Sequence, residues 1–218
     1  MKMTGLFLPL AFMLVVWIAL KIYKANHAKA KGFLGEKLLQ GYLRAHLDPK
    51  NYTIIHDIML PLKDGTTTQI DHLVVCRWGV FVIEAKTYKG WIFGNAKEPS
   101  WTVTHGRRHY KFQNPLRQNY RHIATLSECL GCPESLFHTI VAFSGEAAFK
   151  TEMPPEVMHF GNVPDYIHDH SKVQQIPPER LEEVISAIRE WDHSLTHEQR
   201  KNHVENLRKS HLQGKRKH

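Results

Sequence analysis

The sequence lacks the motifs that would assign its chemistry directly. It has no glycine-rich phosphate loop followed by lysine and serine or threonine, so nothing in it supports ATP dependence. It has no serine-nucleophile motif and no internal repeat. Cysteine is scarce, with three residues in 218, and an odd number excludes the paired disulfide framework of small secreted domains. The class of protein must therefore be inferred from charge, from apolar runs and from short ordered motifs.

Acidic residues are outnumbered by basic ones. The chain has 21 Asp and Glu against 29 Lys and Arg, a formal net charge of +8 with histidines neutral. Such an excess favours an anionic partner, either nucleic acid or anionic lipid. One basic group, interleaved with aromatic residues as nucleic-acid surfaces often are, is expected to bind nucleic acid: Arg107, Arg108, Lys111, Arg117 and Arg121. A merely solvated charged surface is the alternative.

The metal-binding potential of cysteine and histidine is low. Cys129 and Cys132 form a C-x-x-C pair, but no second pair follows, and a structural zinc site needs four ligands. Two ordinary thiols where a helix ends near Gly131 are the expected arrangement. The 16 histidines scatter along the chain. His72 adjoins Asp71, and strand alternation turns it to the opposite face, where we expect it to pack structurally.

The N-terminus contains one long apolar run. No residue from Gly5 to Leu20 is charged, and extension to Tyr23 approaches the ~20 residues that span a bilayer. A cleaved signal peptide is the alternative, but the following small-residue site is poor. Lysines are concentrated after the run, so the positive-inside rule places the rest of the chain in the cytoplasm. We expect a single-pass anchor in the cytoplasmic or cell inner membrane, contacting lipid through residues 5–23.

Two neighbouring segments have the alternation and composition of strands. Residues 67–76 and 80–85, with a turn at Trp78 and Gly79, predict a hairpin. Glu84 and Lys86 then share one face of their strand. If the register brings Asp71 beside Glu84, the two carboxylates supply hard oxygen ligands for Mg²⁺. A solvated Glu84–Lys86 surface pair is the alternative, although a carboxylate within an apolar run is costly to bury without a partner.

Other periodicities predict an α/β fold, with a mixed sheet flanked by helices. An apolar stripe predicts a helix over about 33–47, and Asn114-Pro115 is typical of the start of a second helix. Further strands are expected at 91–93, 101–104, 138–143 and 157–160. Helices are expected at 177–191 and, with a more polar sequence, at 196–210.

Several ordered motifs carry a family resemblance. They are Gly35-Glu36, Gln69 to Val75, Gly79 to Lys86, Gly90 to Gly94, Trp101 and Asn114 to Asn119. Together, over about residues 31–145, they resemble the nuclease-related domain, NERD. The resemblance implies a restriction-endonuclease-like fold of the PD-(D/E)XK superfamily, whose members cut nucleic acid with Mg²⁺.

The resemblance also implies residue roles. Asp71 and Glu84 would bind Mg²⁺, which Mn²⁺ can replace, and Lys86 would position or activate the attacking water. Glu36 would be a further catalytic acid and Gln118 an accessory catalytic residue. From the residues alone, Glu36 equally suits the dipole at the start of a helix, and Gln118 equally suits a solvated helical face. The expected partner is nucleic acid, DNA rather than RNA, and a dimer is compatible with the family.

The chain is accordingly divided into five segments. They are a transmembrane anchor (1–23), a basic juxtamembrane linker (24–32), the nuclease-related domain (33–145), the C-terminal part of that domain (146–192), and a polar helix with a basic tail (193–218). The expected function is that of a membrane-anchored, Mg²⁺-dependent nuclease hydrolysing phosphodiester bonds. The alternatives are a catalytically inactive nucleic-acid-binding domain and a membrane-associated scaffold for protein interactions.

Overall fold

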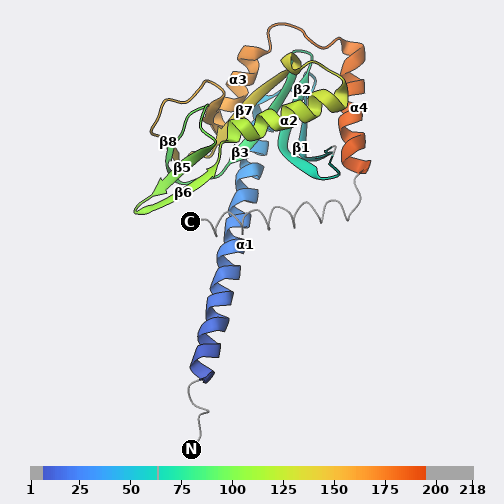
Figure 1. Ribbon diagram of the computed structural model, residues 1–218. Coiled ribbons are helices and arrows are strands. Elements are labelled where there is room, and N and C mark those ends of the chain that lie inside the picture. Colours follow the sequence, from blue (N-terminus) through green and yellow to red (C-terminus); the bar gives the residue numbers. More distant parts are fainter. Residues whose placement is uncertain (1–6, 63, 195–218) are drawn as a thin grey trace, which may run out of the picture.

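The computed structural model describes residues 7–62 and 64–194, in which a long helix leads into a mixed α/β body (Figure 1). The larger elements in chain order are α1 (Phe7–His46), β1 (Tyr52–Pro61), β2 (Thr67–Cys76), β3 (Gly79–Lys86), β4 (Gly90–Phe93), β5 (Ser100–His105), β6 (Arg108–Gln113), α2 (Pro115–Leu130), β7 (Phe137–Phe143), β8 (Ala147–Phe149), β9 (Val157–His159), α3 (Val163–His170) and α4 (Pro178–Ser194). Two 3₁₀ turns, Glu134–Leu136 and Phe160–Asn162, precede β7 and α3. The expected helix at 196–210 lies outside the described residues.

The predicted helix at 33–47 is confirmed, but it is only the end of α1, which continues unbroken through residues 24–32. Its apolar stripe divides between two environments: Leu39 and Leu43 are buried, whereas Leu34 and Leu38 remain exposed. The first half of the helix projects away from the body (Figure 1). The predicted anchor begins outside the described residues, and within them no helix has the length and apolarity needed to cross a membrane.

The main sheet has five strands in the order β1-β2-β3-β7-β9. The first three are antiparallel neighbours, while β7 is parallel to β3 and β9 is parallel to β7. The predicted hairpin is therefore confirmed as β2 and β3, and the predicted strand at 138–143 as β7. The sequence did not predict β1, β6, β8 or α3. This sheet is the platform on which the candidate site is built.

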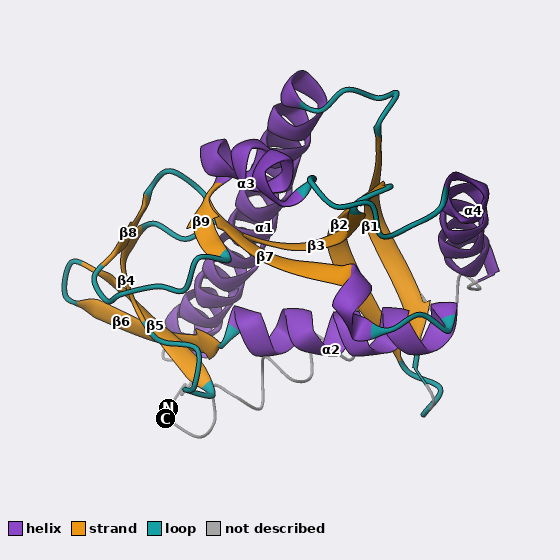
Figure 2. Ribbon diagram, turned by 90° about the horizontal axis from the view of Figure 1, so that it is seen from above, coloured by secondary structure: helices purple, strands orange, loops and turns teal. Residues whose placement is uncertain are grey.

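Helices cover both faces of the main sheet (Figure 2). On one face α2 and α4 bury Ile123, Leu126 and Ile188 against β1, β2 and β3. On the other face α1 and α3 pack through Leu39 and Ile167. The predicted apolar stripe of α4 is confirmed as core packing. Since each helix has one apolar stripe, the two helix pairs enclose the sheet without leaving its centre in water.

The remaining strands form a second sheet, in the order β6-β5-β4-β8. Its core contains Trp101 and Ile92, which pack with Val141, Phe143 and Val157 of β7 and β9. The expectation of one mixed sheet was therefore wrong, because the strand pattern indicates which segments are extended but not which of them pair. The second sheet lies beside the β7 and β9 end of the main sheet (Figure 2).

Candidate active site

The candidate site lies where the β2–β3 ladder ends. Paired residues stop at His72 and Ile83, so the next positions along the register are Asp71 and Glu84. There the side chain of Asp71 takes over from the backbone ladder, because its Oδ2 accepts a hydrogen bond from the backbone N–H of Ala85 at 2.8 Å. Asp71 thus lies beside the Glu84-Ala85 segment, as the hairpin register predicts. The two strands separate at this point and leave polar groups between them.

Lys86 connects three elements of the site. Its Nζ donates to Glu84 Oε1 at 2.5 Å and to Gln118 Oε1 at 3.2 Å, the latter on α2. Only 3% of the Glu84 side chain and 18% of the Lys86 side chain are exposed. The solvated surface pair considered from the sequence is therefore wrong, and so is a purely solvated Gln118. A buried ion pair held by a third polar side chain is a costly arrangement to maintain without a function.

One oxygen of Glu84 is left without a hydrogen bond. Glu84 Oε2 is buried and lacks a hydrogen-bond partner in the described structure; the Nε2 of His122 is 3.5 Å away, close enough for charge attraction but outside hydrogen-bond geometry. His122 is itself oriented by Thr68, whose Oγ1 lies 3.0 Å from its Nδ1. Sequence reasoning did not list His122 as a site residue. Its spacing of four residues from Gln118 on α2 could have indicated it.

The ionisable groups of the site perturb one another. Burial, and then the negative charge of Glu84, raise the pKa of Asp71 well above its usual range, against the opposing effect of Lys86. For Glu84, burial acts to raise the pKa, but the charge of Lys86 and the nearby His122 outweigh it and lower the pKa. For Lys86, burial acts to lower the pKa, but Glu84 and Asp71 outweigh it and raise the pKa. The centre therefore holds a stable Glu84–Lys86 ion pair beside a carboxyl group with a high proton affinity.

Glu36 reaches the same centre from α1. Burial raises its pKa, and the charges of Asp57 and Glu84 raise it further, while Lys86 opposes them. The preceding residue permits this approach: a side chain on Gly35 would collide with Thr87, just beyond β3. Because α1 begins at Phe7, Glu36 is not in a first turn, and the helix-dipole explanation was wrong. The Gly35-Glu36 motif places an acid against the end of β3.

Asp57 is a further acid that sequence reasoning missed. In β1 it stands opposite Asp71, at the one position where β1 and β2 are unpaired within their ladder. Its φ of 55° is left-handed, which is strained for a non-glycine residue in a strand. The side chain accepts a hydrogen bond from Gln69 Nε2 at 2.5 Å. An aspartate within the apolar segment 52–61 was the available signal, and it was lost because β1 itself was not predicted.

The donor set fits Mg²⁺. Within the described residues no three His, Cys, Asp or Glu side chains converge on one point, so a metal here would be held by two carboxylates, Asp71 and Glu84. Mg²⁺ commonly binds in this way, through one or two carboxylates with waters and substrate phosphate completing the shell. The unsatisfied, buried Oε2 of Glu84 is an oxygen that a cation would satisfy. No zinc ligand set occurs in the described chain, and Cys129 and Cys132 are unpaired thiols.

The five predicted nucleic-acid-binding residues fall into two groups. Arg117 and Arg121 are exposed on α2, the helix that carries Gln118, and line a pocket of about 560 Å³. Arg107, Arg108 and Lys111 are exposed on the β5–β6 hairpin of the second sheet. The structure brings the first group close to the catalytic centre and places the second group on a separate element.

His72 has a structural role, as predicted. It is buried, and its Nδ1 lies 2.7 Å from the Nδ1 of His56 on β1. Burial, and then the charge of His56, lower the pKa of His72 to about 3. Burial also lowers the pKa of His56, to about 4, together with Arg44 and Lys37 of α1. Both imidazoles are therefore neutral at physiological pH, and the pair belongs to the packing beneath α1.

A buried acid and an ion pair at the opened end of a hairpin, with a glutamine from a flanking helix, define a phosphodiesterase-like class of site. The family comparison agrees: the nuclease-related domain matches residues 31–144, and the chain belongs to this family. An uncharacterized protein of Bacillus anthracis is 45% identical over 105 residues, which cover 48% of this chain and 49% of that relative. The chain thus spans about half the length of the curated relative it matches. No solved structure matches the chain significantly.

Proposed function

We propose that the chain is a Mg²⁺-dependent nuclease that hydrolyses phosphodiester bonds of DNA or RNA, on a restriction-endonuclease-like fold. The observation that carries the proposal is the buried Glu84–Lys86 pair, with one oxygen of Glu84 unsatisfied and Asp71 beside it. Membership of the nuclease-related domain family supports the same chemistry. The antiparallel hairpin followed by a parallel strand, with helices on both faces, supports the fold assignment.

The side chains have separable roles in this chemistry. Bound at Asp71 and Glu84, Mg²⁺ would neutralise phosphate charge and lower the pKa of a water molecule. Lys86 keeps its positive charge because two carboxylates raise its pKa, so it can stabilise negative charge that develops on the phosphate. Gln118 accepts from Lys86 Nζ and so limits where that charge lies. Glu36, with its raised pKa, can accept or hold a proton at the edge of the site.

The proposal is tested by incubating labelled linear and circular DNA and RNA with the purified chain in Mg²⁺, Mn²⁺ or EDTA. We expect metal-dependent cleavage that falls by at least roughly 10²- to 10³-fold in Glu84→Gln and Lys86→Met, the size of effect seen when one charge-stabilising group is removed. Lys89→Met is the matched control, because Lys89 is 56% exposed and forms only a 3.8 Å surface pair with Glu146. Cleavage that survives both site variants would refute the assignment.

The same experiment separates the alternatives. Salt-dependent nucleic-acid binding without cleavage in any metal would indicate a catalytically inactive binding domain. Absence of binding at low salt would favour a scaffold for protein interactions. The DNA and RNA arms identify the substrate, and sedimentation of the active species measures whether it is a dimer.

Membrane attachment through residues 5–23 is proposed from the sequence, with the nuclease-related domain in the cytoplasm. We expect the full chain to stay in the membrane fraction after alkaline extraction, and a chain lacking residues 1–23 to be released. Protease added outside intact cells should then leave the domain uncut. Release of the full chain by alkaline extraction would contradict the anchor.

A further inference from the structure

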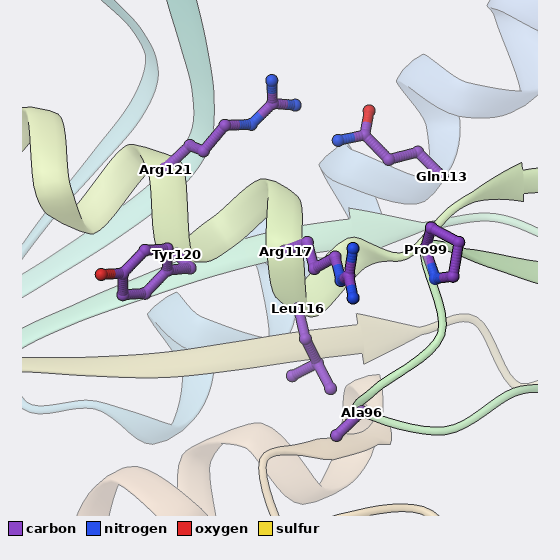
Figure 3. Close-up of a pocket in the computed structure, with 7 residues that line it drawn as sticks. All are labelled: Ala96, Pro99, Gln113, Leu116, Arg117, Tyr120 and Arg121. Carbon is purple, nitrogen blue, oxygen red and sulfur yellow. The ribbon is translucent and has the colours of Figure 1, made fainter.

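A pocket on the first turns of α2 is the largest surface feature that the proposed chemistry leaves unused. It has a volume of about 560 Å³ and is lined by Arg117, Tyr120 and Arg121 of α2, with Pro99 and Gln113 from the segments before the helix. This volume is in the range of pockets that hold small organic ligands. Figure 3 shows Arg117 directed toward Pro99, with Tyr120 one turn further along the helix. The Tyr120 side chain is 59% exposed.

The walls of the pocket are held in place by a fully buried asparagine. The Nδ2 of Asn114 donates to the carbonyl oxygens of Asn95, Ala96 and Glu98, at 3.2, 3.1 and 2.7 Å. Its Oδ1 accepts from the backbone N–H of Leu116 at 2.9 Å and so caps α2. One side chain thus joins the loop on one side of the pocket to the helix on the other. The pocket is pre-organised and does not depend on a ligand to form it.

The lining has the chemistry of a nucleotide site. A tyrosine ring presents a flat face on which any base can stack, and two arginines supply charge for the phosphates on either side. Arg117 also donates from Nη2 to the carbonyl oxygen of Lys97 at 2.5 Å, which fixes its guanidinium at the rim. A base within a duplex is already stacked and paired, so only an unpaired nucleotide can use the tyrosine.

The pocket is close to the catalytic centre along the same helix. Arg121 follows Gln118 by three residues, and residues at this spacing are neighbours on a helix surface. Gln118 in turn accepts from Lys86 Nζ at 3.2 Å. A strand whose phosphate lies at Lys86 therefore reaches Arg121 with an adjacent nucleotide. We infer that this pocket holds an unpaired nucleotide next to the scissile phosphate, so that the substrate class is single-stranded nucleic acid or a single-stranded extension of a duplex. The inference rests on the proposed nuclease function.

The test is the affinity of the full 218-residue chain in mild detergent for fluorescent oligonucleotides, measured by anisotropy in Ca²⁺. The oligonucleotides are single-stranded DNA, single-stranded RNA, a blunt duplex and a duplex with an overhang. We expect Tyr120→Ala to weaken binding of single strands and overhangs by roughly 5- to 150-fold, the loss of one base stacking interaction. Blunt-duplex affinity should change less than about twofold, and Tyr120→Phe should restore tight binding because the ring is kept.

The matched control is Tyr42→Ala, since Tyr42 is 44% exposed on α1 and lies outside the pocket. Equal affinity of wild type and Tyr120→Ala for single strands would overturn the inference, and so would an equal loss for single strands and duplex, or no binding by the wild type. Cleavage is scored separately with Mg²⁺. Cleavage that is intact in Tyr120→Ala removes the pocket but keeps the nuclease, whereas Tyr120-dependent binding without cleavage does the reverse.

Discussion

Asp71→Asn should have opposite effects on stability with and without Mg²⁺. In the metal-free protein, Asp71 is a carboxylate whose ionisation is opposed by burial and by Glu84, which is why its pKa is raised. Asparagine removes that charge and keeps an oxygen that can accept the Ala85 N–H now bonded at 2.8 Å. Replacing a strained active-site group commonly stabilises a protein by about 0.5–2 kcal/mol. For a domain of this size we expect the melting temperature to rise by about 1–8 °C.

The sign with pH follows from the raised pKa. The unfolded chain ionises Asp71 above pH ~3.9, while the folded protein resists ionisation until its higher pKa is passed. The destabilising effect of Asp71 is therefore complete above its folded-state pKa and disappears as the pH falls toward ~4. We expect the stabilisation by Asp71→Asn to be largest at pH 8 and to vanish near pH 4.

Mg²⁺ should reverse the order of stability. A ligand present at about 100 times its Kd stabilises the folded state by about 2.7 kcal/mol, which corresponds to a rise of roughly 5–11 °C in the wild type. Asp71→Asn should show little rise, because one of the two carboxylate ligands is lost. The assay is differential scanning calorimetry in EDTA and in a Mg²⁺ series.

Asp169→Asn is the matched control, since the Asp169 side chain is 75% exposed and its 3.7 Å pair with Lys172 is a surface ion pair. It should change the melting temperature little in either condition. A lower melting temperature of Asp71→Asn in EDTA at pH 8, or an equal response of both proteins to Mg²⁺, would refute the reasoning.

Three further outcomes follow from the structure. Asn119→Ala should destabilise the fold by about 2–4 kcal/mol in urea unfolding, because the fully buried Asn119 donates to the carbonyl oxygens of Val82 and Ile140, at 2.7 and 3.2 Å; a loss below about 0.5 kcal/mol would contradict its role in fixing α2 to the sheet. The pKa values of His56 and His72, lowered to about 4 and about 3, mean that the unfolded chain binds these protons first, so stability is full above pH ~6.5 and should be roughly 2–4 kcal/mol lower at pH 5 than at pH 8; His72→Leu should reduce that difference, and an unchanged difference would count against the pair. Arg121→Ala should lower the slope of log affinity against log salt for nucleic acid by about 0.7–0.9, the loss of one phosphate contact, whereas the exposed Arg189→Ala on α4 should leave it unchanged; equal slopes for both variants would place the nucleic acid elsewhere.

The strand and helix signals were strongest where the local pattern is undisturbed. Regular alternation predicted β2, β3 and β7, and the Asn114-Pro115 start predicted α2, which Asn114 caps in the structure. β1 was missed although it is ten residues long. In it an aspartate with positive φ interrupts the alternation that identifies a strand. The interruption that hid the strand is also what places Asp57 opposite Asp71.

The sequence by itself determined that Glu84 and Lys86 share a face, because strand geometry requires side chains two residues apart to point the same way. It also determined the order of the motifs, and with it the family. Only the tertiary structure decided that Glu36, from a helix about 50 residues away, approaches Glu84, that His122 and Gln118 close the site from α2, and that the remaining strands form a second sheet. These contacts depend on how helices pack across a sheet and on which strands pair, and local sequence patterns carry no information about either choice.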